Sequence, residues 1–148
     1  MPIPSLDANG FLPVGVHDCT PAEIKARFGF FQGSDRRPRL FEKLEMFLSE
    51  AARTGVVVGV VVDGSFVTGK AEPNDIDLIV VVPASHDFGA DLPAYQYNVL
   101  AQQRVRRRFG FDIVVAKMGT DNLAEAVVFF SQVRQRPGLR KGLLRLTL

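Results

Sequence analysis

Hydrophobic residues are arranged in two ways along the chain, as short continuous runs and as residues repeated at helical spacing. Residues 56–62 read Val-Val-Val-Gly-Val-Val-Val, and residues 76–82 are almost wholly apolar. Short apolar runs rich in β-branched residues predict buried strands. Residues 111–116 predict a third strand. Residues 143–148 alternate weakly, which predicts a last strand at an edge of the sheet.

Helical patterns lie between these runs. Thr20 and Glu23 form a capping box with proline at the first helical position, which predicts a short helix over residues 21–28. Apolar residues recur every three or four positions over residues 39–53 and 94–108, and Asp121 can cap a further helix. Three further helices are expected over residues 39–53, 94–108 and 121–134.

Alternating strands and helices predict an α/β (α+β) fold, with a mixed β-sheet flanked by helices. The 148 residues suit a single domain, residues 1–148, that can bury its own core. Residues 1–19 are rich in proline and glycine. They predict an extended leader that either packs on the domain or frays.

Composition excludes some classes of protein. No apolar run approaches the roughly 20 residues needed to cross a bilayer, and the start lacks the pattern of a secretory signal. The single cysteine forms no internal disulfide and fits a reducing compartment. We therefore expect a cytoplasmic protein without membrane contact.

The net charge of +2 says little about partners, but its distribution says more. Arginines cluster over residues 104–108, and basic residues recur over residues 134–145. These clusters predict either a solvated helix face and tail or contacts to phosphate groups.

The most informative acids are Asp75 and Asp77. Two positions apart at the start of a strand, their side chains point the same way. Like charges this close repel, so one would protonate unless a cation lies between them. Mg²⁺ (or Mn²⁺) suits such a pair, because Mg²⁺ commonly binds one or two carboxylates plus substrate phosphates. The alternative is that Asp75 only forms a turn and Asp77 only begins the strand.

Three other features lie near this pair in the sequence. Gly64-Ser65 follows the preceding strand, where backbone amides and the hydroxyl could bind a phosphate or merely form a tight loop. Asp112 lies between apolar residues of the next strand. It could share a metal with the pair, or face solvent and pair with a nearby arginine. Lys70 could reach a phosphate, or be a solvated loop lysine.

Gly64-Ser65, the nine residues 66–74, Asp75-Ile76-Asp77-Leu78 and Phe111-Asp112-Ile113 together resemble the nucleotidyltransferase superfamily that includes DNA polymerase beta. The likeness covers residues 56–116, the expected catalytic core. The leader also looks like the start of a group of small bacterial proteins assigned to that superfamily.

The resemblance implies a nucleotidyltransferase fold and transfer of a nucleoside monophosphate from a triphosphate such as ATP to an acceptor hydroxyl. It implies catalytic and metal-binding roles for Asp75, Asp77 and Asp112, and nucleotide-binding roles for Gly64 and Ser65. The acceptor could be RNA, a protein or a small molecule.

An alternative is a weakly active or inactive binding module that keeps the fold, for example one component of a toxin–antitoxin or defence pair. Members of this small size often need a further subunit to hold the acceptor. About 30 residues follow the third strand, so we expect a homodimer or a separate partner subunit.

Overall fold

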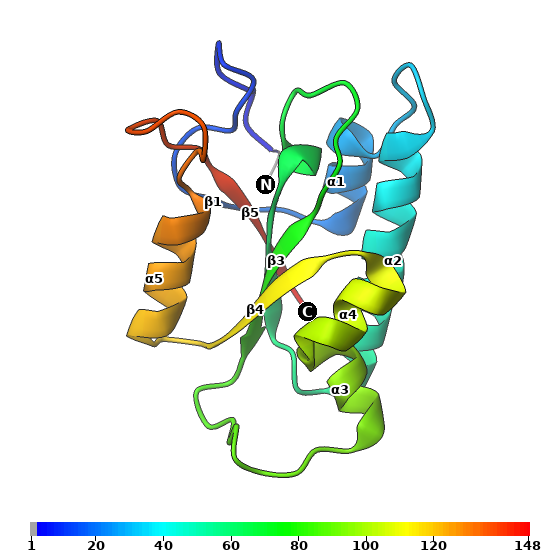
Figure 1. Ribbon diagram of the computed structural model, residues 1–148, viewed down its shortest axis with the longest axis vertical. Coiled ribbons are helices and arrows are strands. Elements are labelled where there is room, and N and C mark those ends of the chain that lie inside the picture. Colours follow the sequence, from blue (N-terminus) through cyan, green and yellow to red (C-terminus); the bar gives the residue numbers. More distant parts are fainter. Residues whose placement is uncertain (1–2) are drawn as a thin grey trace.

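The computed structural model describes residues 3–148 and contains one five-stranded mixed sheet with helices on both faces (Figure 1). The strands are β1 (Val16–Asp18), β2 (Gly59–Asp63), β3 (Asp77–Val82), β4 (Asp112–Lys117) and β5 (Leu143–Thr147). The helices are α1 (Pro21–Phe28), α2 (Arg36–Thr54), the 3₁₀ helix η1 (Ser65–Val67), α3 (Ala94–Leu100), α4 (Gln102–Phe109) and α5 (Asp121–Phe130). The predicted mixed α and β architecture is confirmed.

The strand order is β1-β5-β2-β3-β4. β5 pairs parallel with β1 and antiparallel with β2, so the prediction of an edge strand over residues 143–148 was wrong. Leu143, Leu144 and Leu146 are buried, which means that β5 packs on both of its faces. The exposed Arg145 interrupts the run and gives the weak alternation that suggested an edge.

The leader packs on the domain. Ile3 and Leu12 are buried in the core, and the guanidinium of Arg27 donates to the Ile3 carbonyl at 2.7 Å. The Gly69 amide donates to the Gly10 carbonyl at 2.8 Å. Of the two outcomes expected for residues 1–19, the described part follows the first.

The helix boundaries differ from the predicted ones in identifiable ways. The capping box of α1 is present: Thr20 Oγ1 accepts from the Glu23 amide at 3.2 Å. α2 begins at Arg36, three residues earlier than predicted. The helix expected over residues 94–108 is broken at Ala101, whose ψ of 118° is extended. α5 ends at Phe130 rather than near residue 134.

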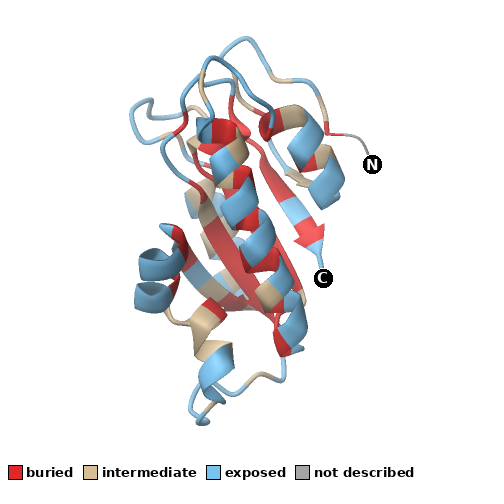
Figure 2. Cartoon of the chain, turned by 90° about the vertical axis from the view of Figure 1, so that its right-hand side faces the viewer, coloured by how far each residue is buried: buried red, intermediate tan, exposed pale blue. Residues whose placement is uncertain are grey.

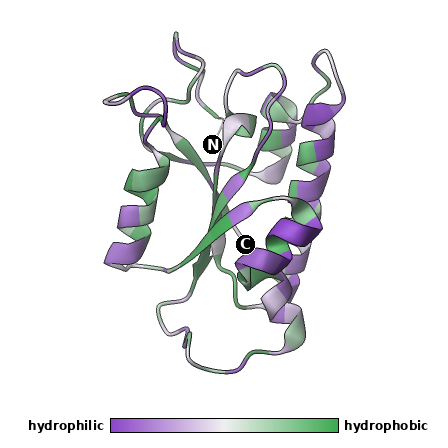
Figure 3. Ribbon diagram, in the orientation of Figure 1, coloured by the Kyte–Doolittle hydropathy of each residue, from purple (hydrophilic) through white to green (hydrophobic). Residues whose placement is uncertain are grey.

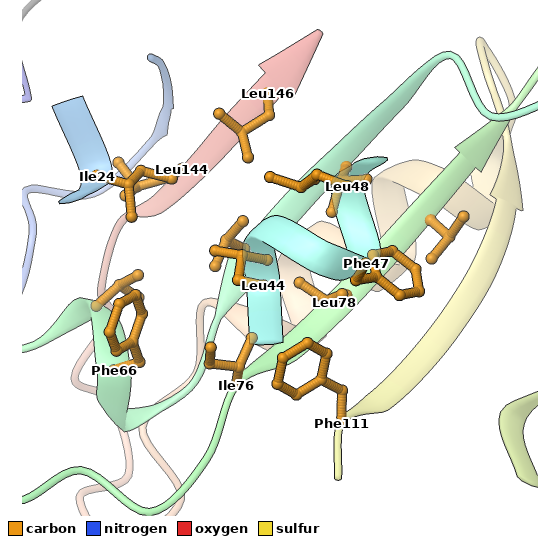
Figure 4. Packing of buried hydrophobic residues seen from close by; sticks show 14 of the residues in the cluster. Ile24, Leu44, Phe47, Leu48, Phe66, Ile76, Leu78, Phe111, Leu144 and Leu146 are labelled. Carbon is orange, nitrogen blue, oxygen red and sulfur yellow. The ribbon is translucent and has the colours of Figure 1, made fainter. Parts of the chain in front are cut away.

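The larger core fills the sheet face covered by α1, α2, α3 and α4, and α2 presents its buried stripe to it (Figure 2). Phe47 of α2 lies edge-on to Phe109, with ring centroids 5.4 Å apart. Figure 4 shows the same cluster joining α1, α2, β3 and β5. A smaller cluster on the opposite face packs beneath α5. The candidate site lies on this second face of the sheet.

Candidate functional site

Three aspartates form a row across adjacent strands. Asp63 ends β2 and pairs in register with Asp77, the first residue of β3. Asp77 in turn pairs with Asp112, the first residue of β4. Side chains in register on neighbouring strands point to the same face. We call Asp63, Asp77 and Asp112 the acidic row; hydrophilic colour marks the starts of β3 and β4 in Figure 3.

The acidic row faces the side of the sheet that α5 covers. Val61, Ile79 and Ala116 belong to the cluster beneath α5. Because strand side chains alternate with a period of two, Asp63 and Asp77 share that face. The row therefore lies at the end of the smaller core, where the covering helix gives way to the segment after Phe130.

Asp77 is half-buried among other acids. Burial raises the pKa of Asp77 to about 6, and the negative charges of the other acidic-row members and of Asp75 act in the same direction. The positive charge of Arg134 lowers the pKa of Asp77 but does not cancel this increase. A carboxylate in this position favours either a proton or a cation.

Asp63 is a site residue that the sequence analysis did not identify. It is buried, and its Oδ1 lies 2.8 Å from the Nζ of Lys141. Burial raises the pKa of Asp63 even though Lys141 lowers it. One sequence signal was available: Asp63 ends an apolar strand immediately before Gly64, where a buried acid needs a partner.

Gly64, Ser65 and Asp75 form one compact turn. Gly64 has a φ of +98°, and a Cβ at that position would lie 2.6 Å from the Asp75 carbonyl oxygen. The Ser65 amide donates to Asp75 Oδ1 at 2.9 Å, and the Ser65 hydroxyl donates to the same oxygen. The donors predicted to meet a phosphate are therefore aimed at an anion, and here that anion is the Asp75 carboxylate.

The hydrogen bonds change the acidity of Asp75. Partial burial alone would raise its pKa, but the two hydrogen bonds from Ser65 and the charges of Lys141 and Lys70 together outweigh burial. The pKa of Asp75 consequently lies below its ordinary value. The pKa of Asp75 is thus lowered and that of Asp77 is raised, although the two residues are only two positions apart.

Asp112 and Lys70 lie at the exposed margin. The guanidinium of Arg106 pairs with Asp112, its Nε donating to Oδ1 at 2.9 Å. This is the arginine pairing considered as one alternative for Asp112, although Asp112 also faces Asp77 across the strands. Lys70 is exposed, as a loop lysine would be, yet it lies near enough to lower the pKa of Asp75.

A buried arginine holds the loop between η1 and β3. Arg37 is 2% exposed, and its guanidinium donates to the carbonyls of Phe66 and Thr68, each at 2.8 Å. It also donates to the Phe28 carbonyl at 3.2 Å and to that of Lys70. The first turn of α2, which precedes the helix predicted to begin at residue 39, thus contains the residue that fixes the site loop.

The acidic row and the Gly64-Ser65 turn border a cleft of about 1170 Å³. Its lining includes all three members of the acidic row, together with Gly64, Ser65, Lys70 and Asp75. The lining also includes the segment after α5, with Arg134, Arg136, Arg140 and Lys141. The predicted site residues therefore share one concave surface, the usual setting for small-ligand binding.

The donor set has the chemistry of a hard-cation site, but its arrangement is incomplete. Across residues 3–148, no group of three or more histidine, cysteine, aspartate or glutamate side chains is arranged to hold a metal ion. Asp75 is engaged by Ser65, and Asp112 by Arg106. Asp77 retains charge that the protein does not compensate. A Mg²⁺ ion at Asp75 and Asp77 would need further oxygen ligands, such as substrate phosphates or waters.

The chain matches the model of one protein family, described as a family of unknown function (DUF6932), over residues 4–147. The chain belongs to the DUF6932 family. No curated protein and no solved structure matches it. Within the described part of this DUF6932 protein, none of the helices has the length and apolar character needed to cross a membrane.

Proposed function

We propose that this DUF6932 protein is a metal-dependent nucleotidyltransferase that moves a nucleoside monophosphate from a triphosphate to an acceptor hydroxyl. One observation carries the proposal. The acidic row across β2, β3 and β4 opens into the same cleft as the Gly64-Ser65 turn. Carboxylates beside phosphate-type donors suit a metal–triphosphate complex.

Asp75 and Asp77 would hold Mg²⁺ or Mn²⁺, with triphosphate oxygens completing the coordination. Such a cation neutralises charge on the entering and leaving oxygens of a displacement at phosphorus. Asp77 supplies a carboxylate whose negative charge is poorly compensated by the protein. Asp75 supplies a second one after its oxygen leaves Ser65, which frees the Ser65 amide and hydroxyl to donate to a phosphate.

Asp112 is the candidate for contact with the acceptor. It heads the outer strand β4 and is exposed, so an acceptor hydroxyl can approach it. Its present partner, Arg106, is also exposed, with 71% of its side chain accessible. Pairs as exposed as this contribute little stability, so the exchange of Arg106 for a ligand costs little.

A second candidate function is a binding module with little or no turnover, such as one half of a toxin–antitoxin or defence pair. The engagement of Asp75 by Ser65 and of Asp112 by Arg106 favours it, because both acids are satisfied without a metal. In that case nucleotide binding would remain while transfer would be absent. A second subunit, either a copy of the chain or another protein, would hold the partner molecule.

The test is a transfer assay with Mg²⁺, each labelled nucleoside triphosphate, and RNA or protein acceptors. The variants are Asp75→Asn and Asp77→Asn, and the matched control is Asp91→Asn in the exposed loop before α3. Transfer that is lost in both variants and kept in the control supports the enzyme. Magnesium-dependent ATP binding without transfer supports the binding module. If the unchanged protein binds neither metal nor nucleotide by calorimetry, both proposals fail.

A further inference from the structure

The segment between α5 and β5 forms a hairpin that carries much of the positive charge of the cleft. Gln132 and Arg140 pair in an antiparallel bridge, and the Lys141 amide donates to the Ser131 carbonyl at 2.8 Å. We call residues 131–141 the basic hairpin. It continues directly into β5, an interior strand, so its base is firmly anchored.

The basic hairpin and the acids line the same cleft. The charged lining residues are four acids and five bases. The acids are Asp63, Asp75, Asp77 and Asp112; the bases are Lys70, Arg134, Arg136, Arg140 and Lys141. A cation bound by the acids would neutralise their charge and leave the basic hairpin with excess positive charge. A ligand with several negative charges in a chain, close to a cation, matches this distribution.

The hairpin arginines are free to make that contact. Arg134, Arg136 and Arg140 are exposed, and within residues 3–148 none of them forms an ion pair at salt-bridge distance. Of the basic residues in this hairpin, only Lys141 forms an ion pair, with the buried Asp63.

Three of the four arginines of α4 are engaged in other contacts, and the fourth, Arg107, does not line the cleft. Arg106 pairs with Asp112, and Arg108 lies 2.9 Å from Glu50. The guanidinium of Arg104 stacks over Tyr97, 5.7 Å from the ring centroid. Of the two basic clusters visible in the sequence, the one with free charge facing the cleft is therefore the basic hairpin.

We propose that Arg134, Arg136 and Arg140 bind the phosphate chain of the nucleotide, so that the basic hairpin selects triphosphates over monophosphates. This inference rests on the proposed function. The guanidinium group presents a planar set of donors that matches phosphate oxygens. The acids of the same cleft would hold the cation, and the hairpin would hold the end of the phosphate chain.

The experiment compares two triple variants by calorimetry in Mg²⁺. The test variant is Arg134→Gln, Arg136→Gln and Arg140→Gln. The control is Arg53→Gln, Arg104→Gln and Arg107→Gln, which removes the same charge from exposed positions on α2 and α4. All six side chains are exposed, so both variants should fold, and thermal unfolding checks this. The probes are ATP, AMP, inorganic tripolyphosphate and a short single-stranded RNA.

We expect the test variant to lose at least about tenfold in affinity for ATP and tripolyphosphate, with AMP changed less than about twofold. The control variant should bind all four probes as the unchanged protein does. Equal ATP affinity in the two triple variants would overturn the inference. Loss of RNA affinity alone would also overturn it, because the hairpin would then contact an acceptor.

The experiment distinguishes a failure of this inference from a failure of the proposed function. If transfer occurs and depends on Asp77, but the hairpin variant binds ATP normally, only the inference fails. If the hairpin variant loses ATP affinity but no acceptor is ever labelled, the inference stands and the enzyme proposal fails. If the unchanged protein binds neither ATP nor tripolyphosphate, both fail.

Discussion

The Nζ of Lys141 lies 2.8 Å from Oδ1 of Asp63, and only 15% and 6% of the two side chains are exposed. This pair links the segment just before β5 to Asp63, the member of the acidic row that ends β2. The loss of one partner of a buried ion pair leaves the other charge uncompensated.

We predict that Lys141→Met lowers the free energy of unfolding by about 3 kcal/mol at neutral pH. The double variant Asp63→Asn with Lys141→Met should be more stable than the sum of the single effects predicts, since neither charge remains. Urea unfolding of the full double-mutant cycle measures the coupling. Lys43→Met, at an exposed position of α2, is the control. Strictly additive single effects would contradict the structure.

Asp77 predicts a pH dependence with a defined sign. Its folded pKa of about 6 exceeds its ordinary value of 3.8, so the folded state binds the proton more tightly than the unfolded state. Ionised Asp77 therefore destabilises the fold. This effect is absent below about pH 3.8, grows through the window up to pH 6 and is complete above it.

Asp77→Asn should accordingly stabilise the protein by roughly 1 kcal/mol at pH 7.5, a value reduced for the partial exposure of the side chain. Near pH 4 the variant and the unchanged protein should be equally stable. Urea unfolding from pH 4 to pH 8 measures the difference, and Asp91→Asn serves as the control. A difference that is constant across this range would show that the charge of Asp77 is not the cause.

Arg37 should be essential to the site loop. Its guanidinium reaches the carbonyls of Phe66, Thr68 and Lys70, which a single ammonium cannot all reach. We expect Arg37→Lys to lower the free energy of unfolding by about 2–4 kcal/mol, because buried acceptors lose their donors. Hydrogen exchange of residues 66–70 should also accelerate.

Arg39→Lys is the matched control for this prediction. Arg39 is on the same helix, and 74% of its side chain is exposed, so the change should be nearly neutral. If Arg37→Lys were as mild as the control, the loop would have to be held by other contacts.

Gly64 should tolerate no side chain. Gly64→Ala places a methyl group 2.6 Å from the Asp75 carbonyl oxygen and imposes a φ of +98° on alanine. We expect a loss of about 2–4 kcal/mol in thermal or urea unfolding. Gly33→Ala has a similar strained φ of +75° but open space around it, so it should lose only about 1 kcal/mol. Equal losses would mean that strain in φ, and not contact with Asp75, decides the cost.

Much of the fold could be predicted from periodicity. The runs 76–82 and 111–116 become β3 and β4 within one residue at each end, although only the first is almost wholly buried. Local signals do not determine which strand is a neighbour of which, and therefore β5 was placed at an edge. The break at Ala101 also leaves no sign in the sequence, since alanine is a good helix former and the extended conformation there is set by tertiary packing.

The candidate site was predictable in part. Asp75, Asp77 and Asp112, with Gly64 and Ser65, all border the cleft, as their spacing suggested. Asp63 was missed because an acid at a strand end is usually solvated, and its burial arises only when β5 brings Lys141 beside it. Arg37 was missed for a similar reason: its four carbonyl partners lie on two distant segments.

The interior position of β5 affects how the protein is made. β5 completes the sheet by joining β1 to β2, so residues from opposite ends of the chain must meet before the fold closes. Contacts between distant segments fold slowly, because loop-closure entropy is lost before they form. During synthesis, β2 would present an open hydrogen-bonding edge until β5 (Leu143–Thr147) emerges, and such edges invite aggregation. Until β5 pairs with it, β2 is therefore an edge at which this chain is open to aggregation.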